Sequence, residues 1–391
     1  MRAVLAPLGA PGFRSVAFAY TAGQVADWFV EVALALAVFD RTGSALARAL
    51  VFVALRVLPA AGLSLAMGLS LAGLSALRAL AVLAMVLGVD ALPVWALLGI
   101  GLADGICSIG GRAGSRVATA QVLIDAEEVR AGNAVLNLGF SIAGAAAPAA
   151  AGLLVSAFGP SAALAPATGL VALAAIAVAR VHNLEHAKPR GGRSLLGVPR
   201  ESRSAHLFAL EALLLVLFTA AVPVELPYVK QSLGAGDAGY GTLLTAWGVG
   251  MVAGSVAFAA LPRTRLPALA GAATVAVAAA YTVMGMAPSL LVACAAAALG
   301  GLGNGVQWVA VVSWIQRRAA AELGARVAAA LEWIAALAPG AGFLLGGLAV
   351  TVLDPRTCLL AFGAAIAAAA PLLAYGGLME RDRLALAGVS D

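Results

Sequence analysis

Ionisable side chains interrupt the long apolar stretches of this sequence at a few positions, and the best spaced of them are Asp27, Glu31 and Arg56. Asp27 and Arg56 are almost equally far from Thr42 in the sequence, one before it and the other after it. On two adjacent antiparallel helices, they would therefore lie at nearly the same depth. Glu31 is one turn above Asp27 on the same face. A carboxylate near an arginine in an apolar medium can hold or release a proton. We expect a proton-coupling or substrate-binding cluster here; the alternative is a static ion pair that orients the two helices.

Other polar residues also occur within apolar stretches, where a charge costs about 2.5–3.5 kcal/mol on insertion scales. The carboxylates among them could line a substrate path or reach water near a helix end. The amides could line a cavity or hydrogen-bond a neighbouring helix. These candidates are Glu211, Glu332, Asn137, Asn304 and Gln307. For Asp104 and Arg112, which are two turns apart, we expect a role in interhelical structure or in a cytoplasmic gate.

The segments that carry these residues are too apolar for a soluble protein. The chain is 62% hydrophobic and 11% charged, whereas soluble domains have about 25% charged residues. Apolar runs of roughly 20 residues are long enough to cross a bilayer. We therefore predict an all-α membrane protein with twelve transmembrane helices in two six-helix halves. The predicted spans are 16–39, 45–67, 70–89, 92–111, 132–156, 162–180, 207–226, 240–261, 267–286, 289–314, 327–350 and 357–377.

One long hydrophilic stretch divides these spans into six and six. It predicts an N-terminal six-helix bundle (1–181), a cytoplasmic linker (182–206) and a C-terminal six-helix bundle (207–391). Small residues and prolines recur at corresponding places in the fifth and eleventh spans, which is typical of duplicated transporter halves. Small residues let helices approach closely, so we expect a role in helix packing or gating. The residues are Gly144, Pro148, Gly152, Pro339 and Gly340.

The distribution of basic residues predicts the orientation of the chain. Most of the 24 Lys and Arg residues fall on the side of the predicted spans that carries both termini. Since positive segments are retained in the cytoplasm, we expect a multi-pass protein of the cytoplasmic (inner) membrane with both termini inside. This topology explains the basic charge without a nucleic-acid partner. The basic residues on the opposite side are Arg41, Arg48, Lys230 and Arg356.

No motif of an enzyme or of a cofactor site stands out in this sequence. Neither lysine follows a glycine, so no phosphate-binding loop is present. His182 and His186 are four residues apart on the predicted linker, where we expect solvated side chains rather than a metal site. The three cysteines lie in apolar segments and are expected to be small buried residues. We therefore expect neither catalysis, nor a cofactor, nor a bound metal.

The chain resembles the major facilitator superfamily and, within it, the drug-exporter and enterobactin-exporter-like branch. The resemblance covers nearly the whole chain and is strongest around the fifth, tenth and eleventh spans, with further similar positions in the first two. The residues that carry it are 130–137 with Pro148 and Gly152, 303–307, Gln316, 324–327, Pro339, Gly340, Asp27, Arg56 and Pro59.

One departure from the superfamily concerns its most specific motif, G-x-x-x-D-R between the second and third helices. The corresponding stretch 62–76 contains no charged residue between Arg56 and Arg78. In the family this acid–arginine pairing is thought to latch the cytoplasmic side. The loop 2–3 motif is therefore degenerate here, which leaves the gating mechanism open.

The resemblance implies a secondary active transporter, a proton-coupled exporter of a small organic molecule (a drug, siderophore or secondary metabolite) that works by alternating access. Export and antiport follow from the resemblance alone. The alternatives are an uptake carrier and a degenerate carrier that acts as a non-transporting receptor or membrane partner. The expected partners are the small-molecule substrate, protons and the lipid bilayer, and we expect a monomer.

Overall fold

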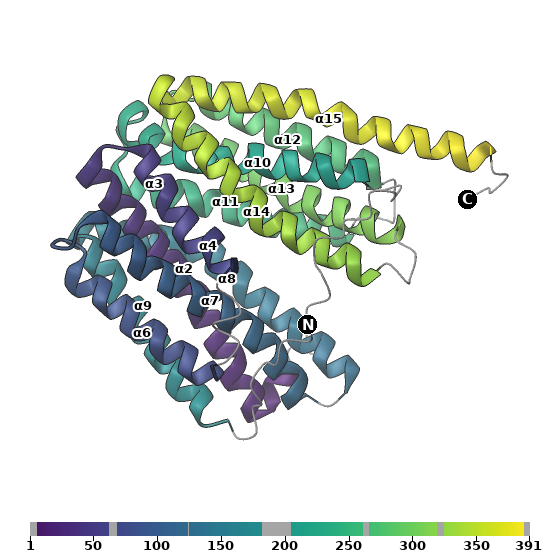
Figure 1. Cartoon of the computed structure of the whole chain (residues 1–391). Coiled ribbons are helices and arrows are strands. Elements are labelled where there is room, and N and C mark those ends of the chain that lie inside the picture. Colours follow the sequence, from purple (N-terminus) through teal and green to yellow (C-terminus); the bar gives the residue numbers. More distant parts are fainter. Residues whose placement is uncertain are drawn as a thin grey trace. The chain divides into compact units, whose positions relative to one another are not determined.

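All regular elements in the described part of the chain are helices, as the computed structural model in Figure 1 shows. The structure describes residues 6–61, 69–123, 125–181, 205–260, 266–318 and 324–386. The elements before residue 182 are η1 (Ala6–Gly9), α2 (Pro11–Thr42), α3 (Ala45–Phe52), η2 (Val53–Val57), α4 (Leu58–Ala61), α6 (Leu71–Gly88), α7 (Val94–Val122), α8 (Ala126–Phe158) and α9 (Pro160–Ala179). Those after residue 204 are α10 (Ala205–Pro227), η3 (Tyr228–Ser232), α11 (Gly236–Ala260), α12 (Leu266–Met286), α13 (Leu290–Arg318), α14 (Gly324–Val352) and α15 (Pro355–Leu386).

The apolar runs of the sequence form the long helices of the structure. Among the described residues, ten helices are long and apolar enough to cross a membrane, as expected where the bilayer core supplies no partner for backbone N–H and C=O groups. The predicted second span is α3, η2 and α4, which together are described only as far as residue 61. In the predicted eleventh span, α14, the apolar part with described side chains is the shorter segment Leu337–Val352. The prediction of a helical membrane protein is therefore confirmed.

Local chemistry fixes where the helices end. α2 continues past its predicted end to Thr42 and stops at Gly43, whose φ of 62° lies in the left-handed region that favours glycine. Ser44 then caps α3, because its side chain accepts a hydrogen bond from the backbone N–H of Ala47. At the start of α15, hydrogen bonds from the Thr357 hydroxyl and backbone lower the pKa of the exposed Asp354 carboxyl.

The predicted second span is not a continuous α-helix. Its middle, η2, has the π-helical hydrogen-bond pattern over residues Val53–Val57. A π turn takes up more residues than an α turn, so it changes both the depth and the direction of the side chains that follow. Arg56 lies within this turn, and the consequence for its ion pair is described below.

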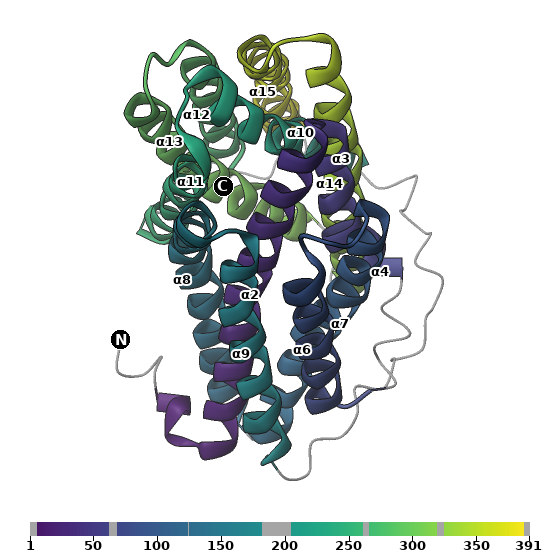
Figure 2. The same ribbon diagram turned by 90° about the vertical axis from the view of Figure 1, so that its left-hand side faces the viewer.

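The chain divides into two compact units. Unit 1 comprises Met1–Gly191 and Ala235–Thr245, and unit 2 comprises Gly192–Gly234 and Ala246–Asp391. In unit 1, α2 packs against α7, α8 and α9, while α6 packs against α7 and α9 (Figure 2). In unit 2, α10 packs against α14 and α15, while α12 packs against α13 and α15. The first residues of α11 belong to unit 1, whereas the predicted C-terminal bundle would include the whole helix.

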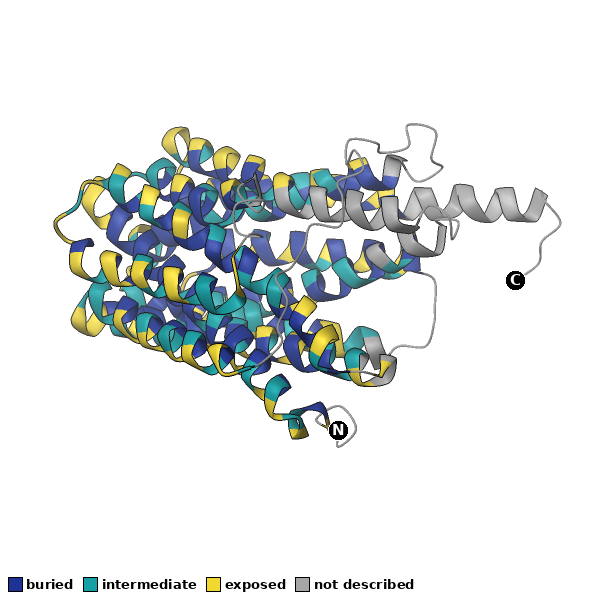
Figure 3. Ribbon diagram, turned by 60° about the horizontal axis from the view of Figure 1, so that its bottom comes forward, coloured by how far each residue is buried: buried dark blue, intermediate teal, exposed yellow. Residues whose placement is uncertain are grey.

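The exposed faces of these helices are apolar. Figure 3 shows exposed residues on the outer faces of helices and buried residues where helices pack. Fully soluble proteins rarely expose such extended apolar surface, whereas a lipid environment favours it. The most exposed large side chains include Leu87, Trp95, Leu291 and Val352.

A seam of glycines joins α11 to α13 within unit 2. Gly250 lies against the backbone of Ala298 and Leu302, and Gly301 lies against the backbone of Trp247 and Met251. A Cβ at either glycine would collide with the backbone of the other helix. Small residues at such positions allow this close approach of membrane helices. The seam fixes the position of α13, which carries Asn304 and Gln307.

Replacing Gly301 with valine is therefore expected to destabilise the protein by about 1–3 kcal/mol, because the added methyl groups must push two helices apart. Thermal melting of the purified protein in detergent would measure the effect. Gly169→Ala on α9 is the matched control, since nothing lies within 4 Å of a Cβ at Gly169. A Gly301→Val protein with the same melting temperature as the control would contradict the close packing of this seam.

Candidate functional site

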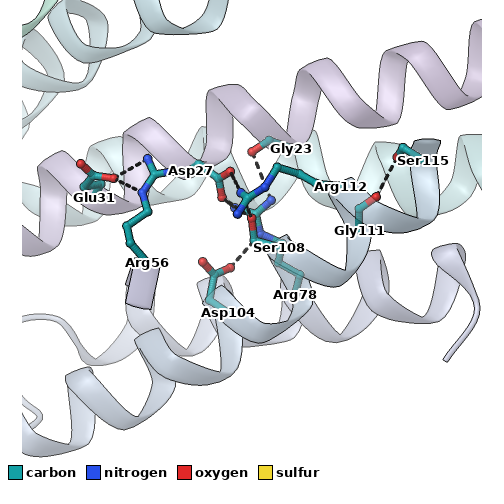
Figure 4. Close-up of polar contacts among 10 residues, drawn as sticks. All are labelled: Gly23, Asp27, Glu31, Arg56, Arg78, Asp104, Ser108, Gly111, Arg112 and Ser115. Carbon is teal, nitrogen blue, oxygen red and sulfur yellow. Dashed lines mark hydrogen bonds and ion pairs between the residues drawn. The ribbon is translucent and has the colours of Figure 1, made fainter. Parts of the chain in front are cut away.

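A network of charged residues lies inside unit 1 and joins three of its helices (Figure 4). Asp27 of α2 accepts hydrogen bonds from Arg78 Nη2 of α6 at 2.5 Å and from Arg112 Nη1 of α7 at 2.7 Å. Arg78 Nε also donates to Asp104 Oδ1 of α7 at 2.9 Å. Ser108 Oγ donates to Asp27 Oδ1 at 2.7 Å. We call Asp27, Arg78, Asp104, Ser108 and Arg112 the charge network.

The charge network is buried and electrically balanced. Arg78 is 5% exposed and Asp104 is 2% exposed, while the side chain of Arg112 keeps 28% of its surface exposed. Two carboxylates face two guanidinium groups, so the cluster needs no further counter-ion. Burying an ion is costly unless it is paired and hydrogen-bonded, and here each carboxylate has at least one arginine. Arg78 satisfies a further donor by bonding the backbone carbonyl of Gly23 at 3.1 Å.

A separate ion pair lies one turn along α2. Arg56 Nη2 lies 2.5 Å from Glu31 Oε2, and Arg56 Nε donates to the same oxygen at 2.7 Å. The guanidinium of Arg56 also lies over the ring of Trp28, 5.6 Å from its centre, in a cation–π contact. The expected pairing of Arg56 with Asp27 is therefore corrected: Arg56 pairs with Glu31, and Asp27 pairs with Arg78 and Arg112.

The correction follows from where the helices end. The equal distances of Asp27 and Arg56 from Thr42 indicate equal depth only if the turn and the second helix form one regular segment. In the structure α2 ends at Thr42 and α3 begins at Ala45. Glu31 lies as many residues before the end of α2 as Arg56 lies after the start of α3. This equal spacing brings Arg56 level with Glu31 rather than Asp27, and the π turn around Arg56 also changes the direction of its side chain.

A polar cavity borders the charge network in unit 1. It lies between α2, α6, α7 and α9, and both arginines of the network line it. Gln24 is 2% exposed, and its amide nitrogen has no hydrogen-bond partner among the described residues. The polar residues that complete the lining are Tyr20, Gln24, Ser75 and Ser115. A water molecule needs such polar partners to occupy a buried cavity, so this cavity suits water beside Asp27.

The predicted site residues of the second half lie in unit 2, where the structure joins two of them. Gln307 Nε2 of α13 donates to Glu211 Oε2 of α10 at 2.8 Å. Asn304 is partly buried on α13. Glu332 lies on α14, but its side chain is outside the described residues. The fifth candidate, Asn137 of α8 in unit 1, is exposed.

The predicted packing residues differ in how closely another helix approaches them. In unit 1, Pro148 is inside α8, and the Gly152 backbone lies against Gly241 of α11. A Cβ at Gly144 would meet the Trp28 ring at 3.7 Å. In unit 2, the carbonyl of Pro339 accepts a hydrogen bond from the Thr219 hydroxyl at 3.4 Å, and Gly340 is buried in α14.

A second buried arginine was not expected from the sequence. Arg48 of α3 is fully buried and donates to the hydroxyl of Tyr240. Its guanidinium also lies over the rings of Phe52 and Tyr240, at 5.1 and 4.7 Å from their centres. From the sequence, Arg48 was counted only among the basic residues on the side opposite both termini. The aromatic residue one helical turn later, Phe52, was the available signal for a buried cation.

Arg78, Asp104 and Arg112 stood out in the sequence as ionisable residues within apolar spans, but not as partners of Asp27. No local pattern tells which helices will pack together. The available signal was charge balance, because two buried acids require two buried bases. Of the degenerate stretch 62–76 between the second and third helices, residues 62–68 lie outside the described residues.

Solved structures with the same arrangement of helices are membrane carriers. A POT family transporter in complex with a thioalcohol-conjugated peptide matches with a TM-score of 0.72 and 10% identity, covering 93% of this chain and 95% of that chain. A bacterial homologue of the iron transporter ferroportin, in an inward-facing state, matches with a TM-score of 0.68 and 16% identity, covering 94% and 98%. The human organic anion transporter MFSD10 matches with a TM-score of 0.61 and 16% identity, covering 92% and 99%.

The fold together with a family model over nearly the whole chain defines a membrane transporter of the major facilitator type. The family model described as "transmembrane secretion effector" matches residues 2–387, and the chain belongs to that major facilitator family. No curated protein matches the chain. The predicted resemblance to the superfamily is thus confirmed at this level.

Proposed function

We propose that this protein is a secondary active transporter that exports a small organic molecule, such as a drug, siderophore or secondary metabolite, in exchange for protons. The observation that carries the proposal is that ionisable side chains are buried inside the membrane-spanning helices, in the charge network of unit 1 and at the Glu211–Gln307 pair of unit 2. Ionisable residues inside membrane spans are expensive and mark transport or proton pathways in many carriers. The description of the family as a secretion effector favours export over uptake.

A repeated packing pattern supports alternating access between two six-helix halves. In unit 1, the pairs α2–α9, α2–α8, α6–α9 and α6–α7 are in contact. In unit 2, the pairs α10–α15, α10–α14, α12–α15 and α12–α13 are in contact. Each pair of the second set lies six predicted spans after its counterpart in the first. Such a repeat suits carriers in which two similar bodies move about a central site.

The cytoplasmic membrane is the proposed location, with both termini and the segment 182–206 inside. The support is the strong bias of basic residues toward one side of the predicted spans. We also propose that the protein works as a monomer.

Everted membrane vesicles provide the test of proton-coupled export. Vesicles that contain the protein, incubated with a cell extract and an inside-acid proton gradient, are expected to accumulate at least one small molecule. Mass spectrometry of the washed vesicles would identify it, and a protonophore is expected to abolish the accumulation.

Vesicles from cells without the gene are the control. Accumulation only in right-side-out vesicles would point to uptake. The absence of protein-dependent accumulation in both kinds of vesicle would favour the non-transporting receptor instead.

A further inference from the structure

Glu211 differs from the buried carboxylates of the charge network because no cation is described beside it. It is 1% exposed within α10, and one of its carboxyl oxygens accepts the hydrogen bond from Gln307. The other oxygen, Oε1, is buried and has no hydrogen-bond partner among the described residues. Gln307 is also 1% exposed. Asp27, Glu31 and Asp104 each have at least one arginine within ion-pair distance.

A bare carboxylate in this position would be strongly disfavoured. An ion without a counter-ion loses its hydration on burial, and one neutral amide does not replace that hydration. Adding a proton at Oε1 removes the charge and leaves Oε2 free to accept from Gln307. The geometry therefore fits a neutral carboxyl group in the conformation described here.

Other ionisable groups lie on the elements around Glu211, and none is described in contact with it. Gly342 of α14 lies against Val216 of α10, and Gly346 lies against Ala220. This parallel register places Glu332 opposite His206, about 7 Å along the helix axis from Glu211. Tyr281 of α12 donates to the carbonyl of Phe218 instead. The other ionisable groups on α10, η3, α12, α13, α14 and α15 are His206, Glu225, Tyr228, Lys230, Tyr281, Cys294, Arg317, Arg318, Arg326, Glu332, Arg356, Cys358, Tyr375, Glu380, Arg381, Asp382 and Arg383.

We propose that Glu211 carries the exchangeable proton of this transporter and that Gln307 positions its carboxyl group. This inference rests on the proposed proton-coupled transport. In the step itself, an O–H bond forms between Glu211 Oε1 and a proton delivered by water while α10 and α13 are open to one side. The same bond breaks when the proton returns to water on the other side. In the conformation described here, Glu211 is 1% exposed, so a proton on its carboxyl group is held away from solvent.

The Asp27 carboxylate is a poorer candidate for this step. Two guanidinium groups and the Ser108 hydroxyl hold it in place. A proton on Asp27 would leave Arg112 without an acid, whereas a proton on Glu211 displaces no described ion pair. The role left to the charge network is to join α2, α6 and α7.

Infrared spectroscopy of the purified protein tests the proton without any knowledge of the cargo. The wild-type protein at neutral pH is expected to show the carbonyl stretching band of a buried protonated carboxyl group. Glu211→Gln is expected to lose that band, and Glu128→Gln on an exposed turn of α8 is expected to keep it. A band that is unchanged in Glu211→Gln would overturn the proposal.

Gln307→Leu gives a second, independent measurement if the Glu211 variant does not fold. It removes the amide that donates to the carboxyl group, so the carbonyl band is expected to move to higher frequency. A band at the wild-type frequency would show that the protonated group is not the partner of Gln307, and would overturn the proposal.

Transport measurements on vesicles distinguish a failure of this inference from a failure of the proposed function. Everted vesicles with Glu211→Gln are expected to lose proton-driven accumulation and to keep downhill exchange of the cargo identified with the wild type. A merely structural role for Glu211 would preserve both, because glutamine keeps the volume and the hydrogen bond. Full proton-driven accumulation in this variant would overturn the role of Glu211 but not the proposed function. Wild-type vesicles that accumulate nothing would overturn the proposed function.

Discussion

Replacing Arg78 with methionine is expected to destabilise the protein by about 3–5 kcal/mol, because this change leaves buried carboxylates without their partner. Arg78 bonds Asp27, Asp104 and the Gly23 carbonyl from one guanidinium group. Asp27 would keep Arg112 and Ser108, but Asp104 would lose its ion pair. The yield and the melting temperature of the purified protein would both fall.

Three variants make this expectation specific. Arg116→Met, on an exposed face of the same helix as Asp104, should melt like the wild type. Arg78→Lys should recover only part of the loss, since an ammonium group cannot reproduce the fork geometry of the guanidinium group. Arg78→Met combined with Asp104→Asn should recover more, because one acid and one base remain. An Arg78→Met protein as stable as Arg116→Met would refute the central place of Arg78 in the network.

The helical class was predictable because the bilayer sets it. Runs of about 20 apolar residues have few alternatives to a membrane helix, and the predicted spans agree with the helices to within a few residues at most ends. The larger differences have local causes. α7 extends to Val122 and α15 to Leu386, beyond the apolar runs from which their spans were predicted. The polar ends of these helices carry little of the apolar signal.

The residues of the site were easier to predict from the sequence than the ion pairs that they form. Asp27, Glu31 and Arg56 are visible in the sequence because any charge stands out in an apolar run. Counting residues from Thr42 gave the wrong partner for Arg56, because α2 ends at Thr42 while α3 begins only at Ala45. Arg78 could not be assigned to Asp27 because they are separated by 51 residues and the packing of α6 has no local signature.

The pairing in unit 2 was hidden for a similar reason. Glu211 and Gln307 were each recognised as polar residues on apolar helices, but they are 96 residues apart. What makes Glu211 distinctive is the lack of a described cation around it, and that becomes visible only when the neighbouring helices are in place. The sequence therefore favoured a proton-coupling cluster of Asp27, Glu31 and Arg56, because it does not show that Asp27 has two arginine partners.

Replacing Asp27 with asparagine is expected to lower the stability by about 1–3 kcal/mol, because Arg112 loses the acid that it contacts. The loss should be smaller than for Arg78→Met, since part of the Arg112 side chain reaches solvent. Arg78 still pairs with Asp104 in this variant. Yield, melting temperature and vesicle transport would be measured together.

Two double variants distinguish a structural Asp27 from a proton-coupling one. Asp27→Asn with Arg112→Gln removes one acid and its partner, so it should recover both stability and proton-driven transport. Asp27→Asn with Arg56→Gln should be less stable than the single variant, because Glu31 then loses its arginine as well. If the first double variant is stable but transports its cargo only downhill, the coupling proton belongs to Asp27. If it is stable and fully coupled, Asp27 serves the structure of unit 1, and the proton must be carried elsewhere, as we propose for Glu211.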